Sequence, residues 1–250
     1  MNPLPVALAL ALTLPVSSLR ADEAVAILNR VRANRPVKDL ALKARLFLTR
    51  ERFVPVEILI QQTATDSRTI YRGQQTELLV VQPLTGEPRY YLKETGELTG
   101  SRRLQKLLDS QFVVYDLGLP FLRWPDPKLI GEDRTRGRDC YLIECRAAAQ
   151  PYARVKLWID KEYNALLSAE AFNADDRLLR RFSVTSFKRV GEIWIPRGLE
   201  SGLVLPGQAL PAEERSRLEI YEGNYDAHLP ADWFDPARFG DPAGRAPARP

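Results

Sequence analysis

The chain has 250 residues, of which 45% are hydrophobic and 27% are charged, so it has enough apolar side chains for one sizeable core. Its 36 Lys and Arg residues nearly balance its 32 Asp and Glu residues, which leaves a formal net charge of +4. The basic residues are dispersed among acidic ones and form no stripe along the sequence, and this argues against a nucleic-acid-binding protein.

The N-terminal residues have the pattern of a secretory signal peptide. An apolar run extends from Leu4 to Val16, and small residues follow it up to Ala21. The run is short for a membrane span. We therefore expect residues 1–21 to be removed after export, with cleavage after Ala21 or after Ser18. A buried N-terminal helix is the alternative interpretation. No cysteine follows the run, so we expect an exported, soluble protein without a lipid anchor.

A helix is predicted from Asp22 to the residue before Pro36, because acidic residues favour a helix start and proline discourages its continuation. Four apolar residues share one face of this helix: Ala24, Ile27, Leu28 and Val31. Strands are predicted beyond it, where apolar and polar residues alternate or turn residues divide short β-rich runs. They cover residues 42–49, 54–61, 69–72, 77–82 and 89–93.

Residues 98–130 break the alternating pattern. A short helix is predicted first, in which Leu104, Leu107 and Leu108 share a face, and an irregular apolar segment follows. Glycine and proline prevent that segment from being one continuous helix. So much apolar surface on a connection must cover another part of the molecule. It is either a plug that seals the sheet or a lid over a ligand cavity.

Strands are predicted again over residues 128–146, as a strand, a turn and a second strand. Residues 155–200 follow as four strands joined by three polar turns, with one apolar face. A last strand is predicted at residues 217–225. The closing segment after it carries three aromatic anchors: Trp233, Phe234 and Phe239.

These elements add up to about eleven strands and two main helical segments in a single domain over residues 22–239. No linker divides this range. Residues 240–250 contain no apolar anchor, so we expect a disordered tail.

Signatures of catalysis are missing from the sequence. The one histidine, His228, lies in a late loop, which leaves little for a zinc site or a Ser-His-Asp triad. Cys140 and Cys145 are five positions apart on one predicted strand. They would point to opposite faces at about 16 Å, which is too far for a disulfide. No phosphate-binding glycine motif occurs. We therefore predict no catalytic residue, no metal and no cofactor.

Residues 155–200 and their surroundings resemble the LolA-like family of exported outer-membrane lipoprotein-sorting proteins. The matching motifs are Leu-Trp-Ile-Asp-Lys at 157–161, Gly-Glu-Ile-Trp-Ile-Pro at 191–196 and Gly-Arg-Asp-Cys-Tyr at 137–141. The first helix and the closing aromatic segment also resemble the start and the end of these proteins. The resemblance covers most of the chain after residue 21.

The resemblance implies a mainly β (α+β) fold, which is a strongly curved antiparallel half-barrel of about eleven strands with helices covering its concave face. It also implies a non-enzymatic periplasmic carrier or chaperone that binds the acyl chains of lipids or lipoproteins on their way to the outer membrane. A membrane protein of the envelope is a possible partner, and a monomer is expected. The alternative is an envelope adaptor or structural protein whose core is filled. A hydrolase is a third reading, and it lacks a candidate site.

For an acyl-binding surface, the apolar faces of the sheet and of the cover are the candidates. The sheet would contribute Leu46, Leu48, Val56, Ile58 and Ile60. The cover would contribute Leu107, Leu108, Phe112, Phe121 and Trp124. The same residues would form the core if the interior is filled.

Overall fold

The computed structural model of the chain describes residues 16–148, 150–204 and 215–239. The strands in chain order are β1 Leu40–Phe47, β2 Phe53–Gln62, β3 Asp66–Arg72, β4 Glu77–Pro83, β5 Arg89–Leu92, β6 Gly96–Glu97, β7 Lys128–Thr135, β8 Arg138–Arg146, β9 Arg154–Asp160, β10 Leu166–Phe172, β11 Leu178–Val190, β12 Ile193–Leu203 and β13 Arg215–Tyr225. The helices are α1 Val16–Ala33 and α2 Val114–Leu117, and the short 3-10 turns are η1 Gly100–Leu104, η2 Pro120–Arg123 and η4 Ala231–Phe234.

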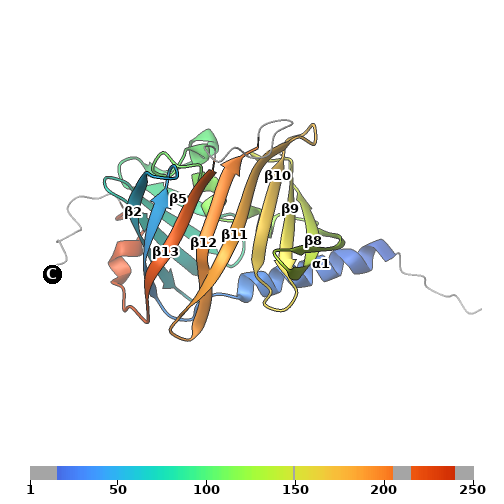
Figure 1. Cartoon of the computed structure of the whole chain (residues 1–250), viewed down its shortest axis with the longest axis horizontal. Helices are drawn as coiled ribbons and strands as arrows, with labels where there is room; N and C mark the ends of the chain where they lie inside the picture. Colours follow the sequence, from blue (N-terminus) through green and yellow to red (C-terminus); the bar gives the residue numbers. More distant parts are fainter. Residues whose placement is uncertain (1–15, 149, 205–214, 240–250) are drawn as a thin grey trace, which may run out of the picture.

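All thirteen strands form one curved antiparallel sheet (Figure 1). Its order is β6-β5-β4-β3-β2-β1-β13-β12-β11-β10-β9-β8-β7, so two meanders meet where β1 pairs with β13. The chain leaves the first meander at β6, on one edge, and enters the second at β7, on the other edge. Residues 98–127 must therefore pass from edge to edge, and they do so across the concave face. This crossing explains why a connecting segment is so apolar.

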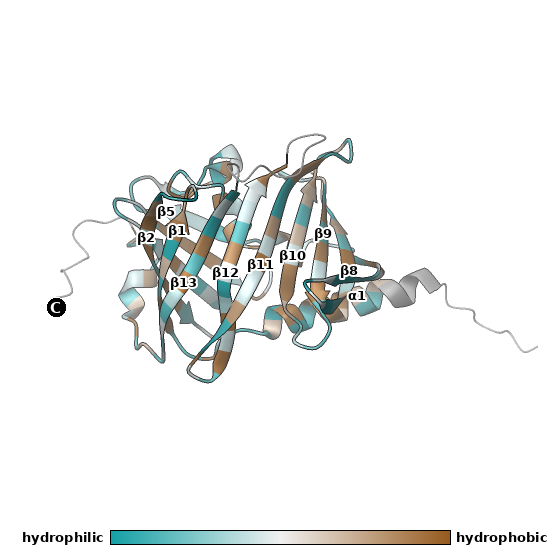
Figure 2. Cartoon of the chain, viewed as in Figure 1, coloured by the Kyte–Doolittle hydropathy of each residue, from teal (hydrophilic) through white to brown (hydrophobic). Residues whose placement is uncertain are grey.

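Alternation along the strands separates the concave face from the convex one (Figure 2). On β1 the residues Leu40, Leu42, Ala44 and Leu46 are buried in one core cluster, whereas Lys43 and Arg45 between them are exposed. The first half of the cover completes this cluster, because Leu107 and Phe112 pack into it. One half of the concave face is thus filled by residues 98–117.

Helix α1 fills the other half of the concave face. Its side chains Ala24, Ile27 and Leu28 are at most 1% exposed and pack with β8–β10 and with residues 119–124 of the cover. The apolar stripe predicted for this helix is confirmed. The helix begins at Val16 and not at Asp22, so it extends through the expected cleavage point after Ala21. Residues 1–15 of the expected signal peptide lie outside the described residues. Among the residues that the structure describes, no helix is long and apolar enough to cross a membrane.

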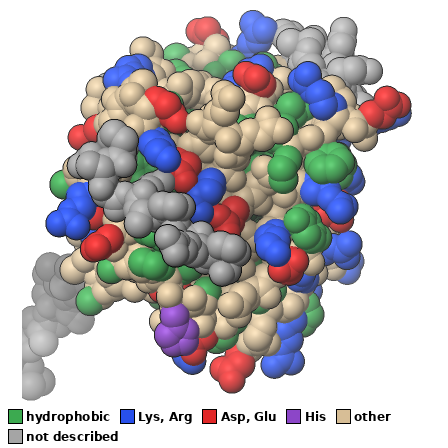
Figure 3. Space-filling view, turned by 90° about the vertical axis from the view of Figure 1, so that its left-hand side faces the viewer, with side chains coloured by type: hydrophobic (Ala, Val, Ile, Leu, Met, Phe, Trp, Pro, Cys, Tyr) green, Lys and Arg blue, Asp and Glu red, His purple; other side chains and the backbone are tan. Residues whose placement is uncertain are grey.

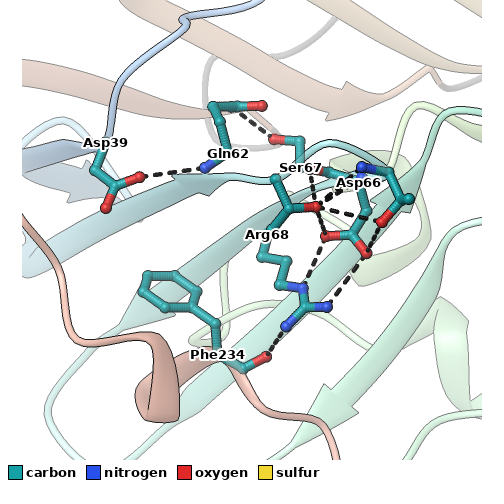
Figure 4. A network of polar contacts seen from close by, with 8 residues as sticks. Asp39, Gln62, Asp66, Ser67, Arg68 and Phe234 are labelled. Carbon is teal, nitrogen blue, oxygen red and sulfur yellow. Dashed lines mark hydrogen bonds and ion pairs between the residues drawn. The ribbon is translucent and has the colours of Figure 1, made fainter.

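The closing segment packs on the convex face of β2–β5. Phe234 and Phe239 are buried there with Leu59, Ile70 and Leu79. A polar network holds the segment to β3 (Figure 4): Arg68 Nε donates to Asp66 Oδ1 at 2.8 Å, and Arg68 Nη1 donates to the carbonyl of Phe234 at 3.2 Å. The predicted anchoring role of Phe234 and Phe239 is confirmed. The expected disordered tail, residues 240–250, lies outside the described residues.

Three details of the sequence prediction are corrected. The sheet has thirteen strands and not eleven, partly because β6 has only two residues and no alternation can indicate so short a strand. The described residues contain two α-helices, so the concave face is covered by one long helix and a largely irregular segment. The predicted helix with Leu104, Leu107 and Leu108 on one face does not form. Leu108 and Asp109 have positive φ angles of 50° and 59°, and the Leu107 N–H donates to the Phe112 carbonyl at 2.8 Å.

Candidate functional site

A cavity of about 640 Å³ opens at the edge of the sheet where α1 ends. In Figure 1 this is the lower edge, where the β11–β12 hairpin extends past its neighbours. The cavity lies between residues 34–36, which follow α1, and strands β1, β2 and β10–β13. Its volume falls within the range of roughly 300–1,000 Å³ that is usual for small-molecule sites.

Cross-strand apolar pairs build the walls. Leu40 faces Ile60 and Leu42 faces Ile58 across β1 and β2, and all four side chains line the cavity. On the other side, Leu199 faces Leu218 across β12 and β13, and both of these line it too. Directly opposed pairs of this kind give a sheet a continuous apolar surface. The cover fills the concave face elsewhere but leaves this stretch of wall open.

Aromatic side chains stand at the mouth of the cavity. Tyr163, Phe187 and Trp194 line it and are nevertheless exposed, and Trp194 keeps 65% of its surface accessible. Large apolar side chains that are exposed next to a cavity mark a site of contact with an apolar partner. The mouth is therefore suited to an apolar ligand that enters from outside.

An ion pair supports one side of the mouth. The Asp160 side chain is 2% exposed, is paired with Arg138, and accepts hydrogen bonds from the backbone N–H groups of Glu162 and Tyr163 at 2.9 and 2.7 Å. Burial alone would raise the pKa of the Asp160 carboxyl. The guanidinium of Arg138 and the two backbone donors outweigh burial, so this pKa lies below its usual value.

The end of α1 is fastened to the same turn. Asn34 Nδ2 donates to the carbonyl of Tyr163 at 2.9 Å, and Arg30 Nε donates to Asn164 Oδ1 at 3.0 Å. Asn164 has a positive φ of 49°, a conformation that asparagine tolerates better than most residues. The β9–β10 turn and the end of α1 thus form one continuous border of the cavity.

The residues proposed from sequence lie in three different places. Ile58 and Ile60 line the cavity. The first core cluster contains Leu46, Val56, Leu107 and Phe112, with Leu48 and Leu108 packed against it. The second core cluster contains Phe121 and Trp124. Of the ten side chains, the two from the end of β2 therefore lie at the cavity, and the other eight pack within or against the cores on either side of it.

Sequence reasoning missed the contribution of β12 and β13. Ile195, Leu199, Leu218 and Ile220 line the cavity, and none of them was singled out. The alternating Ile-Trp-Ile motif at 193–195 is the sequence signal for the apolar face of β12. The signal for β13 was the strand prediction itself, but only the pairing of β13 with β1 shows which wall it joins.

The described residues that line the cavity include no histidine and no cysteine. His228 has a side chain that is 82% exposed, lies in a loop after β13 and does not line the cavity. Cys140 and Cys145 are free and buried on β8. Among the described residues, no group of three or more His, Cys, Asp or Glu side chains could hold a metal. The face in Figure 3 shows acidic and basic side chains interspersed, without the stripe expected of a nucleic-acid interface.

Among the comparisons with known proteins, the solved structures identify the fold. A family model described as "Uncharacterized protein" matches residues 90–240, which is more than half of the chain. No curated protein matches. Among solved structures, the chain is similar to a DUF1329 family protein from Desulfovibrio piger, with 16% identity, a TM-score of 0.73 and coverage of 88% of this chain and 99% of the other.

The descriptions of two further similar structures name lipoprotein sorting or the LolA superfamily, in agreement with the resemblance predicted from the sequence. A putative outer membrane lipoprotein-sorting protein domain from Vibrio parahaemolyticus has 13% identity and a TM-score of 0.74, over 88% of this chain and 99% of the other. A LolA superfamily protein from Nitrosomonas europaea has 18% identity and a TM-score of 0.53, over 85% of this chain and 97% of the other. At these identities the similarity establishes a shared curved-sheet fold.

Proposed function

We propose, because solved structures described as a lipoprotein-sorting domain and a LolA superfamily protein share the fold of this chain, that it is a periplasmic carrier that holds the acyl chain of a lipid or lipoprotein in the cavity at the end of α1. The carrier would act without covalent chemistry, in transport toward the outer membrane. Residues 22–239 would be the mature domain after removal of the signal peptide.

The open apolar cavity is the observation that carries this proposal. An adaptor with a filled core would not be expected to leave a cavity of about 640 Å³ that is lined by Leu42, Ile58 and Leu199. Burial of one methylene group contributes about 0.8 kcal/mol, so roughly a dozen methylenes would contribute about 10 kcal/mol before the cost of ordering the chain. This is enough to keep an acyl chain out of water during transfer.

The aromatic mouth supports entry and release at the same place. Tyr163, Phe187 and Trp194 offer apolar surface to a chain that is partly withdrawn from the cavity. A carrier must release its ligand, and a mouth that opens to the outside allows exchange without unfolding of the sheet. A membrane protein of the envelope, as donor or acceptor, would meet the carrier at this edge.

The test begins with gentle purification of the exported protein, lipid extraction and mass spectrometry, followed by titration with a fluorescent fatty acid. We expect a stoichiometric acyl lipid and saturable binding of the probe. Ile60→Trp should fill part of the cavity and weaken probe binding by about tenfold or more, which corresponds to about 1.4 kcal/mol.

Ile130→Trp is the matched control, because Ile130 is exposed on β7 and does not line the cavity. It should leave probe binding unchanged, and thermal unfolding should verify that both variants are folded. Absence of acyl lipid together with absence of probe binding to the folded wild type would contradict the carrier and favour the adaptor.

A further inference from the structure

We propose that three arginines beside the cavity, Arg32, Arg35 and Arg123, form a binding site for an anionic head group, a carboxylate or a phosphate, of the amphiphile whose chain occupies the cavity. This inference rests on the proposed carrier function and deepens it, because it names the chemical class of the ligand.

The three side chains come from α1, from the residues that follow it and from η2. Arg32 lies in the last turn of α1, and its Nη1 donates to the carbonyl of Leu122 at 3.0 Å. Leu122 directly precedes Arg123 on η2. Arg35 follows the end of α1 and lines the cavity itself. The guanidinium of Arg32 is thus held next to Arg123. Of the three arginines, Arg35 is the one that lines the apolar cavity.

The positive charge of these arginines is not compensated within the described residues. There, Arg32, Arg35 and Arg123 form no ion pair with a carboxylate. Burial lowers the pKa of Arg123, and the neighbouring charges of Arg32 and Arg35 lower it further. Glu87 is the carboxylate whose field acts on Arg123 in the opposite sense, but it is exposed and makes no hydrogen bond to Arg123.

One donor of Arg123 has no acceptor. Its Nε donates to the carbonyl of Pro83 at 3.2 Å, whereas Nη1 is buried and has no hydrogen-bond partner among the described residues. A buried donor without an acceptor costs about 1–3 kcal/mol, and more if it is charged. An anion at this point would accept from Nη1 and offset the repulsion among the three guanidiniums.

Arg138, the other arginine at the cavity, is less suited to bind an anionic head group. Arg138 also lines the cavity, but its guanidinium is already paired with Asp160 and with Glu162. The alternative role for the arginines is to bind backbone carbonyls and to favour the C-terminal end of α1. That role accounts for the bonds to Leu122 and Pro83. It leaves the guanidinium of Arg35 and Nη1 of Arg123 without an acceptor in the part of the chain that the structure describes.

The experiment compares ligands that share one chain and differ in the head group: dodecanoate, dodecyl phosphate and dodecanol, with inorganic phosphate as the probe for a free anion. Affinities of the full exported chain are measured by calorimetry at low and high salt. We expect the two anionic amphiphiles to bind about tenfold or more tightly than dodecanol, with an advantage that shrinks in high salt. Inorganic phosphate alone should bind weakly, because it gains nothing from the apolar wall.

Arg35→Gln and Arg123→Gln should each reduce the advantage of the anionic amphiphiles by about tenfold and leave the affinity for dodecanol unchanged. Arg35 is only partly buried, so its variant keeps the test valid if Arg123→Gln does not fold. Arg50→Gln is the matched control, since Arg50 is exposed in the turn after β1, at the opposite end of that strand from Leu40.

Two results would overturn the arginine site. Equal affinity for dodecanoate, dodecyl phosphate and dodecanol would overturn it while the carrier function stands. Inorganic phosphate that binds as tightly as dodecyl phosphate would show a site for small anions that is independent of the cavity. If none of the three amphiphiles binds the folded protein, both the arginine site and the carrier function are wrong.

Discussion

At the scale of single residues, Asp160 shows how one buried carboxylate organises the mouth of the cavity. It accepts from Arg138 and from two backbone N–H groups of the β9–β10 turn, and that turn holds the end of α1 through Tyr163 and Asn164. The Leu-Trp-Ile-Asp-Lys motif that contains Asp160 is visible in the sequence, but nothing in it indicates an ion pair. Only the fold brings Arg138, 22 positions away, to its side chain.

Replacement of Asp160 by asparagine should lower the free energy of unfolding by about 1–3 kcal/mol near neutral pH, because the charged acceptor of Arg138 is lost. The pKa of the carboxyl is lower in the folded protein than its ordinary value of 3.8. Its stabilisation is therefore complete above that ordinary value and is lost as the pH falls through the lower folded value.

Urea unfolding of the wild type and of Asp160→Asn at pH 7 and near pH 3 measures this effect. The difference between the two proteins should shrink at the lower pH. Asp175→Asn is the control, since Asp175 is exposed in the β10–β11 turn, and it should change little. A difference of the same size at both pH values would mean that the Asp160 charge contributes nothing.

At the scale of elements, the alternating pattern predicted the strands well and the connection poorly. The four strands over residues 155–200 form where period-two alternation and polar turns placed them. Alternation works there because each strand has one face toward the core and one toward solvent. Residues 98–127 cross the concave face without a regular partner. Their conformation depends on side chains that are distant in sequence, and Leu108 and Asp109 adopt positive φ angles that local periodicity cannot indicate.

The cover segment is packed as part of the core, so its truncation should destabilise the whole protein. Phe112 is 2% exposed and packs in the first core cluster. Phe112→Ala should lower the free energy of unfolding by about 3–5 kcal/mol, as other buried phenylalanines do. Phe53→Ala is the matched control, because Phe53 is exposed on β2, and its effect should be much smaller. Equal effects in urea unfolding would mean that residues 98–117 are a loose lid.

At the scale of the whole molecule, the site follows from how two meanders are joined. Pairing of β1 with β13 closes the sheet into one curved wall, and the crossing segment and α1 fill its concave face from the two sides. The space that they leave lies at the end of α1. Sequence patterns could predict a curved sheet, a cover and an apolar interior. They could not predict the volume left open, because it depends on how closely the two halves of the cover approach each other.

The most direct test of the account is to map where an acyl chain binds. A fatty acid with a photoreactive diazirine near its terminal methyl group is bound to the folded protein, irradiated, and located by peptide mass spectrometry. The account predicts labelling within β1, β2, β12 and β13, at or beside Leu42, Ile58, Leu199 and Ile220, and loss of this labelling in Ile60→Trp. Labelling confined to exposed surfaces, or unchanged in Ile60→Trp, would contradict it.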